Sequence, residues 1–162
     1  MTAAAHDTST AVFEPEFVAE LTKMFEERIV FNHLLGLRVE ALTPASVRLR
    51  LAMRDELIGH FTHSRLHGGV ISATLDAVGG LAVMAAIGAR HLDEPLLARM
   101  ARFNKLGTID LRIDYLRPAT GPRFSASAHV LRLGSRVAST RMEFVDAQGR
   151  LLSTGAAAYI VS

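Results

Sequence analysis

One long apolar stretch constrains the fold of this chain more than any other feature. Residues Val70–Ala89 contain a single charged side chain, that of Asp76. A helix that is apolar on every side must be buried, either in a protein core or in a membrane. A lone carboxylate within such a helix is costly unless it is paired, hydrogen-bonded or protonated. The stretch therefore predicts a buried helix whose one acid has a defined partner or task.

The same stretch is about as long as a membrane span, but its composition favours a core helix. It is rich in alanine and glycine, and no cluster of lysine or arginine marks one of its flanks. Asp76, near its centre, would cost about 2.5–3.5 kcal/mol on insertion into a membrane. We therefore expect a core helix and no membrane span.

Composition narrows the classes of protein that remain. At 162 residues, the chain is long enough for one domain with a substantial core. It has no cysteine, which excludes disulfides and thiolate zinc ligation and is compatible with a cytoplasmic location. A net charge of +2 without a basic stripe gives no sign of nucleic-acid binding. Residues 1–12 are small or polar and predict a disordered tail, followed by a single domain over residues 13–162.

Hydrophobic periodicity divides this domain into helices and strands. Apolar positions recur at helical spacing after Pro15 and end near Leu35, where Gly36 can terminate the helix. A loop over Arg54–Leu66 and an irregular connector over His91–Arg102 flank the apolar helix. Alternating segments predict six strands, the last four forming one antiparallel meander: Leu37–Leu42, Val47–Met53, Leu106–Arg117, Phe124–Leu133, Arg136–Val145 and Arg150–Val161.

This order of elements predicts an α+β fold, with an antiparallel sheet wrapped around one long central helix and an amphipathic helix before it. Gly79 and Gly80 each weaken the central helix by up to about 1 kcal/mol relative to alanine. We therefore expect the helix to approach the sheet closely at these residues. One face of the sheet would lack cover, which favours a symmetric dimer.

Three features together carry a resemblance to a known family. They are His67-Gly68-Gly69 before the apolar helix, Asp76 on that helix, and the strand and turn from Gly107 to Pro118. From Gly36 to the C-terminus the chain resembles the hot-dog fold acyl-CoA thioesterases of the PaaI-like group. Within that group it is most similar to a proteobacterial subfamily that acts on medium and long acyl-CoA chains. The resemblance implies an enzyme that hydrolyses a medium- or long-chain or an aryl acyl-CoA to free acid and CoA, a homodimer or homotetramer, and a role in fatty acid metabolism.

The helix start and its acid have the properties that thioester hydrolysis needs. Gly68 and Gly69 lie where free amide groups and the positive end of the helix dipole favour developing negative charge, although they could simply allow a tight turn. The resemblance points to the Gly68 amide as the oxyanion donor. Asp76 could activate water or attack the thioester itself. In the resembling enzymes the two halves of a site come from different subunits, which implies that Gly68 and a partner's Asp76 share one site.

Other candidate residues depend more strongly on the resemblance. His67 could bond the thioester carbonyl or brace its loop, and Thr108 stands where the family often has a serine or threonine near the attacking water. His60 stands where related enzymes commonly have asparagine, and this departure leaves its role open. Arg117 and Arg136, at strand ends, could bind the phosphates of CoA, although exposed arginines also serve solubility.

The chain lacks the spacing of metal ligands beyond His60 and His63, so we expect no metal and no cofactor. An acyl channel could be lined by residues that are otherwise part of the core: Met84, Met100, Met142, Phe61 and Phe103.

Two rival functions remain open. One is a hot-dog dehydratase or isomerase in which His67 and Asp76 move protons on the acyl chain, and the other is a non-catalytic acyl-CoA-binding protein.

Overall fold

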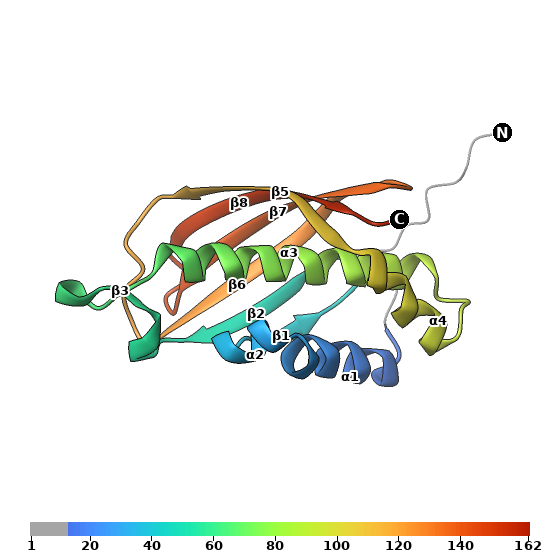
Figure 1. The fold of residues 1–162 in the computed structure, drawn as a ribbon, viewed down its shortest axis with the longest axis horizontal. Coiled ribbons are helices and arrows are strands. Elements are labelled where there is room, and N and C mark those ends of the chain that lie inside the picture. The colour runs from blue at the N-terminus through green and yellow to red at the C-terminus, as the bar shows by residue number, and fades with distance from the viewer. Residues whose placement is uncertain (1–12) are drawn as a thin grey trace.

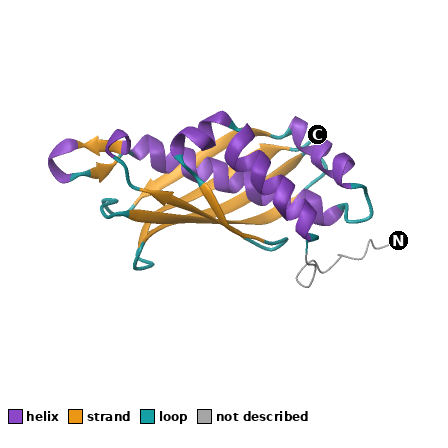
Figure 2. Ribbon diagram, turned by 90° about the horizontal axis from the view of Figure 1, so that it is seen from below, coloured by secondary structure: helices purple, strands orange, loops and turns teal. Residues whose placement is uncertain are grey.

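The computed structural model describes residues 13–162, so the tail predicted over residues 1–12 lies outside the described residues. Residues Gly68–Arg90 form the long helix α3, which lies along one face of an antiparallel sheet (Figures 1 and 2). By length and composition α3 could cross a membrane. However, most of its side chains are buried in one apolar core that the sheet and the other helices complete. The prediction of a sheet around one long core helix is confirmed.

The main sheet contains six strands in the order β1-β2-β6-β7-β8-β5, and every pair of neighbours is antiparallel. β2 shows how the pattern of side chains produces this arrangement. Val47, Leu49 and Leu51 are buried in the core, whereas the alternating Arg48 and Arg50 face solvent. The bounds of the strands are β1 (Arg38–Leu42), β2 (Val47–Ala52), β5 (Gly107–Tyr115), β6 (Arg123–Leu133), β7 (Val137–Asp146) and β8 (Leu151–Ile160).

The prediction of a four-stranded meander is wrong for its first strand. Of the four strands predicted to form the meander, only β6, β7 and β8 pair consecutively, and β5 pairs with β8 at the far edge of the sheet. Residues 116–122 connect β5 to β6 across the end of the sheet. Seven extended residues reach up to about 24 Å, which is enough to pass two strands spaced about 4.8 Å apart. Local alternation identifies a strand but not the neighbour it will choose.

The predicted single amphipathic helix is divided. Helix α1 (Pro15–Lys23) continues into a π-helical turn, Met24–Arg28, and the chain leaves helical geometry at Ile29 (φ −80°, ψ 93°) before α2 (Val30–Leu35). Gly36 ends α2 in the left-handed conformation (φ 71°), as expected. Both pieces lie on the same side of the sheet, next to α3 (Figure 2). Apolar spacing therefore continues across the break and hides it from sequence analysis.

The segments on either side of α3 are more regular than predicted. The expected loop before α3 contains a small hairpin of β3 (Ile58–His60) and β4 (Arg65–Leu66), which projects from one end of the molecule (Figure 1). The expected irregular connector after α3 contains helix α4 (Leu96–Ala101). Short 3-10 turns complete these segments at Asp55–Leu57, Phe61–His63 and Arg102–Lys105.

The two glycines in the middle of α3 have different surroundings. A Cβ atom at Gly79 would overlap the hydroxyl of Tyr159 on β8 and the sulfur of Met142 on β7. Close approach of the helix to the sheet therefore explains Gly79, as predicted. The same explanation is wrong for Gly80, where a Cβ atom would have no neighbour closer than 3.8 Å.

Candidate active site

Asp76 lies half-buried in the middle of α3 and is held by two hydroxyl groups from the sheet. Thr108, at the start of β5, donates a hydrogen bond of 2.8 Å to its Oδ1 atom. The hydroxyl of Tyr159, on β8, lies 3.3 Å from the same Oδ1 and donates to the main-chain carbonyl of Asp76 at 2.9 Å. These bonds partly offset the cost of a carboxylate on an apolar helix. They leave the Oδ2 atom without a hydrogen bond from the described residues.

Tyr159 contacts the candidate acid, and the sequence analysis did not single it out. Its side chain is only 2% exposed. Burial, followed by the negative charge of Asp76, raises the pKa of its phenol far above the usual range. The hydroxyl therefore stays protonated and acts as a donor. Alternation placed Tyr159 on a strand, but only the register of β8 against β5, in which Thr108 faces Tyr159, places it beside the acid.

The side chain of Asp76 lines a mostly apolar pocket of about 300 Å³. One wall is the face of α3 from Ala73 to Met84, and the opposite wall comes from the π-helical turn and α2. Thr108 and its neighbours at the start of β5 form a third side. The polar atoms that Asp76, Thr108 and Asn32 contribute lie among apolar side chains such as Phe25 and Leu81. This arrangement suits a substrate with a reactive polar group and a long apolar part.

The start of α3 presents one unused amide. His67 is the N-cap, and its Nδ1 atom accepts a hydrogen bond of 2.8 Å from the amide of Gly69. A side chain at Gly69 would press against the imidazole, at 2.9 Å from Nδ1. The predicted substrate contact of Gly69 therefore has no free amide to use. The amide of Gly68, at the first position of the helix, has no acceptor among residues 13–162.

The main chain at Gly68 is fixed by Tyr115, another residue that the sequence analysis did not single out. The hydroxyl of Tyr115, at the end of β5, donates a hydrogen bond of 2.9 Å to the Gly68 carbonyl. Strand β5 thus contacts α3 twice, through Thr108 at one end and Tyr115 at the other. Gly68 lines a second pocket with Arg117, separate from the pocket of Asp76. Eight residues of helix place Gly68 and Asp76 about 12 Å apart along the axis.

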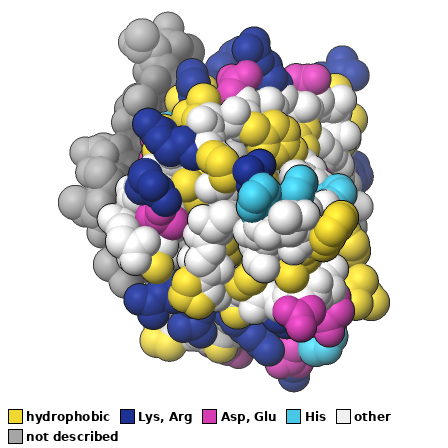
Figure 3. All heavy atoms as spheres, turned by 90° about the vertical axis from the view of Figure 1, so that its left-hand side faces the viewer, with side chains coloured by type: hydrophobic (Ala, Val, Ile, Leu, Met, Phe, Trp, Pro, Cys, Tyr) yellow, Lys and Arg dark blue, Asp and Glu magenta, His cyan; other side chains and the backbone are white. Residues whose placement is uncertain are grey.

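His60 lies away from the acid within this chain. It is exposed on the β3–β4 hairpin, where its ring stacks on His63 with centroids 5.0 Å apart. Figure 3 shows histidine side chains gathered on this end of the molecule. Among the described residues, the side-chain partners of Asp76 are Thr108 and Tyr159 alone. No three histidine, aspartate or glutamate side chains within residues 13–162 form a cluster that could hold a metal ion.

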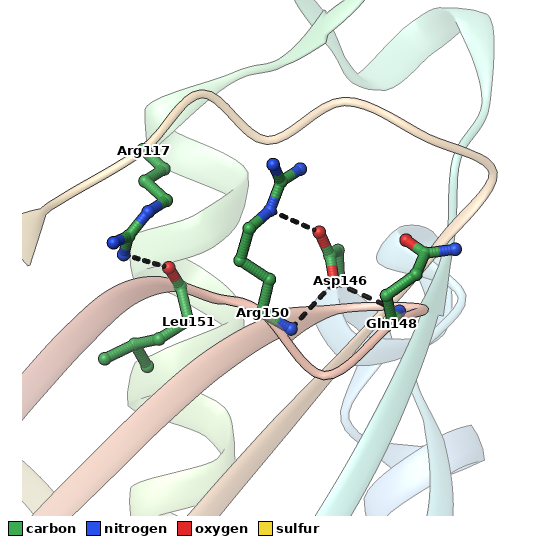
Figure 4. Close-up of polar contacts among 5 residues, drawn as sticks. All are labelled: Arg117, Asp146, Gln148, Arg150 and Leu151. Atoms are coloured by element: carbon green, nitrogen blue, oxygen red, sulfur yellow. Dashed lines mark hydrogen bonds and ion pairs between the residues drawn. The ribbon is translucent and has the colours of Figure 1, made fainter.

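The two candidate phosphate-binding arginines lie at opposite ends of the sheet. Arg117 follows β5, and its guanidinium donates a 2.8 Å hydrogen bond to the carbonyl of Leu151, where β8 begins (Figure 4). Arg136 precedes β7, and its carbonyl accepts a bond from Val161, just after β8 ends. The ten residues of β8 separate them by roughly 30 Å. One chain therefore cannot direct both arginines at the same phosphate group.

A sheet wrapped around a single helix, with an acid from that helix in an apolar pocket, defines a hot-dog fold protein. A family model described as the thioesterase superfamily matches residues 63–153. The chain is 36% identical over 155 residues to a protein named medium/long-chain acyl-CoA thioesterase YigI from Salmonella typhimurium. That match covers 94% of this chain and 99% of the relative. The chain belongs to the thioesterase superfamily, as its resemblance predicted.

Solved structures support the same assignment. A protein from Shewanella oneidensis, described as related to the thioesterase superfamily, superimposes with a TM-score of 0.85 and 35% identity, covering 93% of this chain and 100% of that one. A variant of the phenylacetic acid degradation protein PaaI from Thermus thermophilus gives a TM-score of 0.63 at 25% identity. It covers 82% of this chain and 99% of that chain. The predicted fold and family are confirmed.

Proposed function

We propose that the protein is an acyl-CoA thioesterase that hydrolyses medium- or long-chain acyl-CoA to a free acid and CoA. The observation that carries this proposal is the Asp76 carboxylate, positioned by Thr108 in a mostly apolar pocket. The pocket offers space for an acyl chain directly beside a group that can accept a proton. The name of the Salmonella relative supports the same substrate class.

In the proposed reaction Asp76 accepts a proton from water as the water oxygen attacks the thioester carbonyl carbon. The carbonyl oxygen becomes an oxyanion, and collapse of this intermediate breaks the C–S bond. The thiolate of CoA leaves and takes the proton that Asp76 accepted from water, which restores the carboxylate. Direct attack by Asp76, giving an anhydride that water then hydrolyses, uses the same geometry. Thr108 holds Oδ1 in place, so that Oδ2 faces the reacting group in either mechanism.

The oxyanion donor in this proposal is the amide of Gly68 from a second copy of the chain. Within one chain this amide lies in a different pocket from Asp76. A homodimer resolves the separation if Asp76 of one subunit meets Gly68 of the other. His67 would then lie beside the thioester, with its Nδ1 held by the Gly69 amide and its Nε2 free to donate.

The edge strand β5 supports this dimer. It is the last strand of the sheet, and much of it is exposed, which favours pairing with another chain. Antiparallel pairing of two copies centred on Leu111 would place Asp110 opposite the partner's Arg112, which is a favourable pair of charges. It would also place Thr108, which holds Asp76, opposite the partner's Asp114, one residue from the partner's Tyr115, which holds Gly68.

The same pairing gives both candidate arginines a role with the phosphates of CoA. Arg117 lies at the Gly68 end of its chain, and Arg136 lies at the Thr108 end. A site built from two chains would therefore be flanked by Arg117 from one and Arg136 from the other. We also place the enzyme in the cytoplasm, because a chain without cysteine needs no oxidising compartment.

The test is thiol release from acetyl-, octanoyl-, palmitoyl- and phenylacetyl-CoA by the wild type and by Asp76→Asn. Asparagine is nearly isosteric but cannot accept the proton, so we expect a loss of about 10²-fold or more. Glu143→Gln, which changes an exposed carboxylate that lines neither the Asp76 pocket nor the Gly68 pocket, should keep full activity. Equal rates in the wild type and Asp76→Asn would remove Asp76 from the mechanism. Saturable binding without thiol release would indicate an acyl-CoA-binding protein. Loss or gain of water on the acyl chain would indicate a dehydratase.

A further inference from the structure

Gly80 is a glycine that the packing of the chain does not explain. Its neighbour Gly79 is required because Tyr159 and Met142 fill the space where a side chain would stand. At Gly80 the nearest atom to an added Cβ would be Cε1 of Tyr159, at 3.8 Å, an ordinary contact distance. Glycine is the poorest residue for a helix interior apart from proline. Alanine would therefore fit this chain at Gly80 and strengthen α3.

The space beside Gly80 is the pocket that contains Asp76. Gly80 lies four residues after Asp76, on the same face of α3 and about 6 Å further along the axis. Met84 lines the pocket one turn beyond Gly80. Asp76, Gly80 and Met84 thus lie in a row that begins at the carboxylate and runs along the helix. Gly80 has no side chain, so the pocket is least filled from the helix at this position.

The wall of the pocket that faces these three residues has a fixed shape. The π-helical turn and the break at Ile29 direct Phe25 and Ile29 toward α3, where both line the pocket. The side-chain amide of the buried Asn32 donates a hydrogen bond of 3.1 Å to the carbonyl of Phe25. This bond ties α2 back to the π-helical turn. The wall therefore cannot readily move inward to fill the space over Gly80.

We propose that Gly80 is a specificity-determining residue that lets the acyl chain pass along α3 from Asp76 toward Met84. This inference rests on the proposed acyl-CoA thioesterase activity and adds the path of the substrate chain. About 6 Å of helix corresponds to roughly five bonds of an extended chain. A butanoyl group ends before Gly80, whereas octanoyl and palmitoyl groups must pass it. A side chain at this position selects against long acyl groups only.

The experiment compares kcat/KM for butanoyl-, octanoyl- and palmitoyl-CoA in Gly80→Ala, Gly80→Leu and the wild type. We expect Gly80→Leu to lose about tenfold or more on octanoyl- and palmitoyl-CoA and to keep butanoyl-CoA hydrolysis within about threefold. Gly80→Ala should show the same preference in weaker form, with a melting temperature that is unchanged or a few degrees higher. The matched control is Ala86→Leu, since Ala86 is half-buried on the same helix and does not line this pocket. It should leave the ratio of long- to short-chain activity unchanged.

Several results would overturn the inference. Equal losses on all three substrates would show that Gly80 acts on the reacting group or on stability, and an unchanged ratio would show that the chain takes another path. A change from dimer to monomer in Gly80→Ala, measured by light scattering, would show that the glycine serves a subunit contact. Absence of thiol release by the wild type would instead refute the proposed function, so the two failures can be told apart.

Discussion

The hydroxyl of Thr108 donates a hydrogen bond of 2.8 Å to the Oδ1 atom of Asp76, joining the start of an edge strand to the middle of the core helix. The two residues are 32 positions apart in the chain. Their contact depends on the pairing of β5 with β8, which places Thr108 next to Tyr159. The contact of this strand with the helix fixes one carboxylate oxygen, while the other has no hydrogen bond from the described residues.

We expect Thr108→Val to lower kcat by about tenfold or more, because valine keeps the shape of threonine but removes the hydrogen bond that orients Asp76. Thr108→Ser retains the hydroxyl and should keep most of the activity. Steady-state thiol release measures both variants. If Thr108→Val keeps full kcat, the hydrogen bond to Asp76 does not contribute, and Thr108 acts only through its methyl group and strand packing.

Gly68→Pro tests the oxyanion donor directly because it removes the amide hydrogen. Proline is well tolerated at the first position of a helix, and His67 (φ −64°, ψ 134°) already has the conformation preferred before proline. We expect a loss of about 10²–10³-fold in kcat. The control is Gly68→Ala, which keeps the amide and adds a Cβ in ordinary contact with Tyr115, at 3.5 Å. Similar activities in the proline and alanine variants would show that the amide does not stabilise the oxyanion.

Mixing inactive variants tests whether two chains share each site. Gly68→Pro and Asp76→Asn should each be inactive as a homodimer. After co-refolding at equal amounts, hybrid dimers contain one intact site of two, so activity should recover to about a quarter of the wild type. Thiol release before and after co-refolding measures this recovery. No recovery, with hybrid dimers demonstrated by differently tagged chains, would place both residues in a site within one chain.

Asp146 should make stability depend on acidic pH. Its buried carboxylate accepts hydrogen bonds from the amides of Arg150 and Gln148 and from the Arg150 side chain (Figure 4). The Arg150 amide above all holds the pKa of Asp146 below its usual range. Because the folded pKa is the lower one, the stabilisation is fully present above the unfolded pKa of about 4. It is lost as pH falls through the folded pKa.

Asp146→Asn should therefore melt at a lower temperature than the wild type at pH 7, and the difference should shrink below about pH 4. Calorimetric melting curves between neutral and acidic pH measure the effect. Glu143→Gln, an exposed position on the same strand, serves as the control and should follow the wild type. A difference that stays constant with pH would mean that the charge of Asp146 does not stabilise the β7–β8 turn.

The sequence by itself determined those features that depend on neighbours along the chain. The largely apolar composition of Val70–Ala89 predicted a buried helix. The alternation of Val47, Leu49 and Leu51 with arginines predicted a strand with one solvent-exposed face. The single charge of Asp76 identified the candidate acid, and the glycines before the helix identified its start. These features follow from helical and strand periodicity, which is local.

Only the tertiary structure decided which distant groups meet. Apolar periodicity could not reveal the break at Ile29, because apolar residues recur at helical spacing on both sides of it. Alternation could not place β5 beside β8, and that pairing brings Thr108 and Tyr159 to Asp76. The reason is physical: strand order and register are set by packing between segments far apart in the chain, which local patterns do not encode. The same packing leaves no space for a Cβ atom at Gly79 and enough space for one at Gly80.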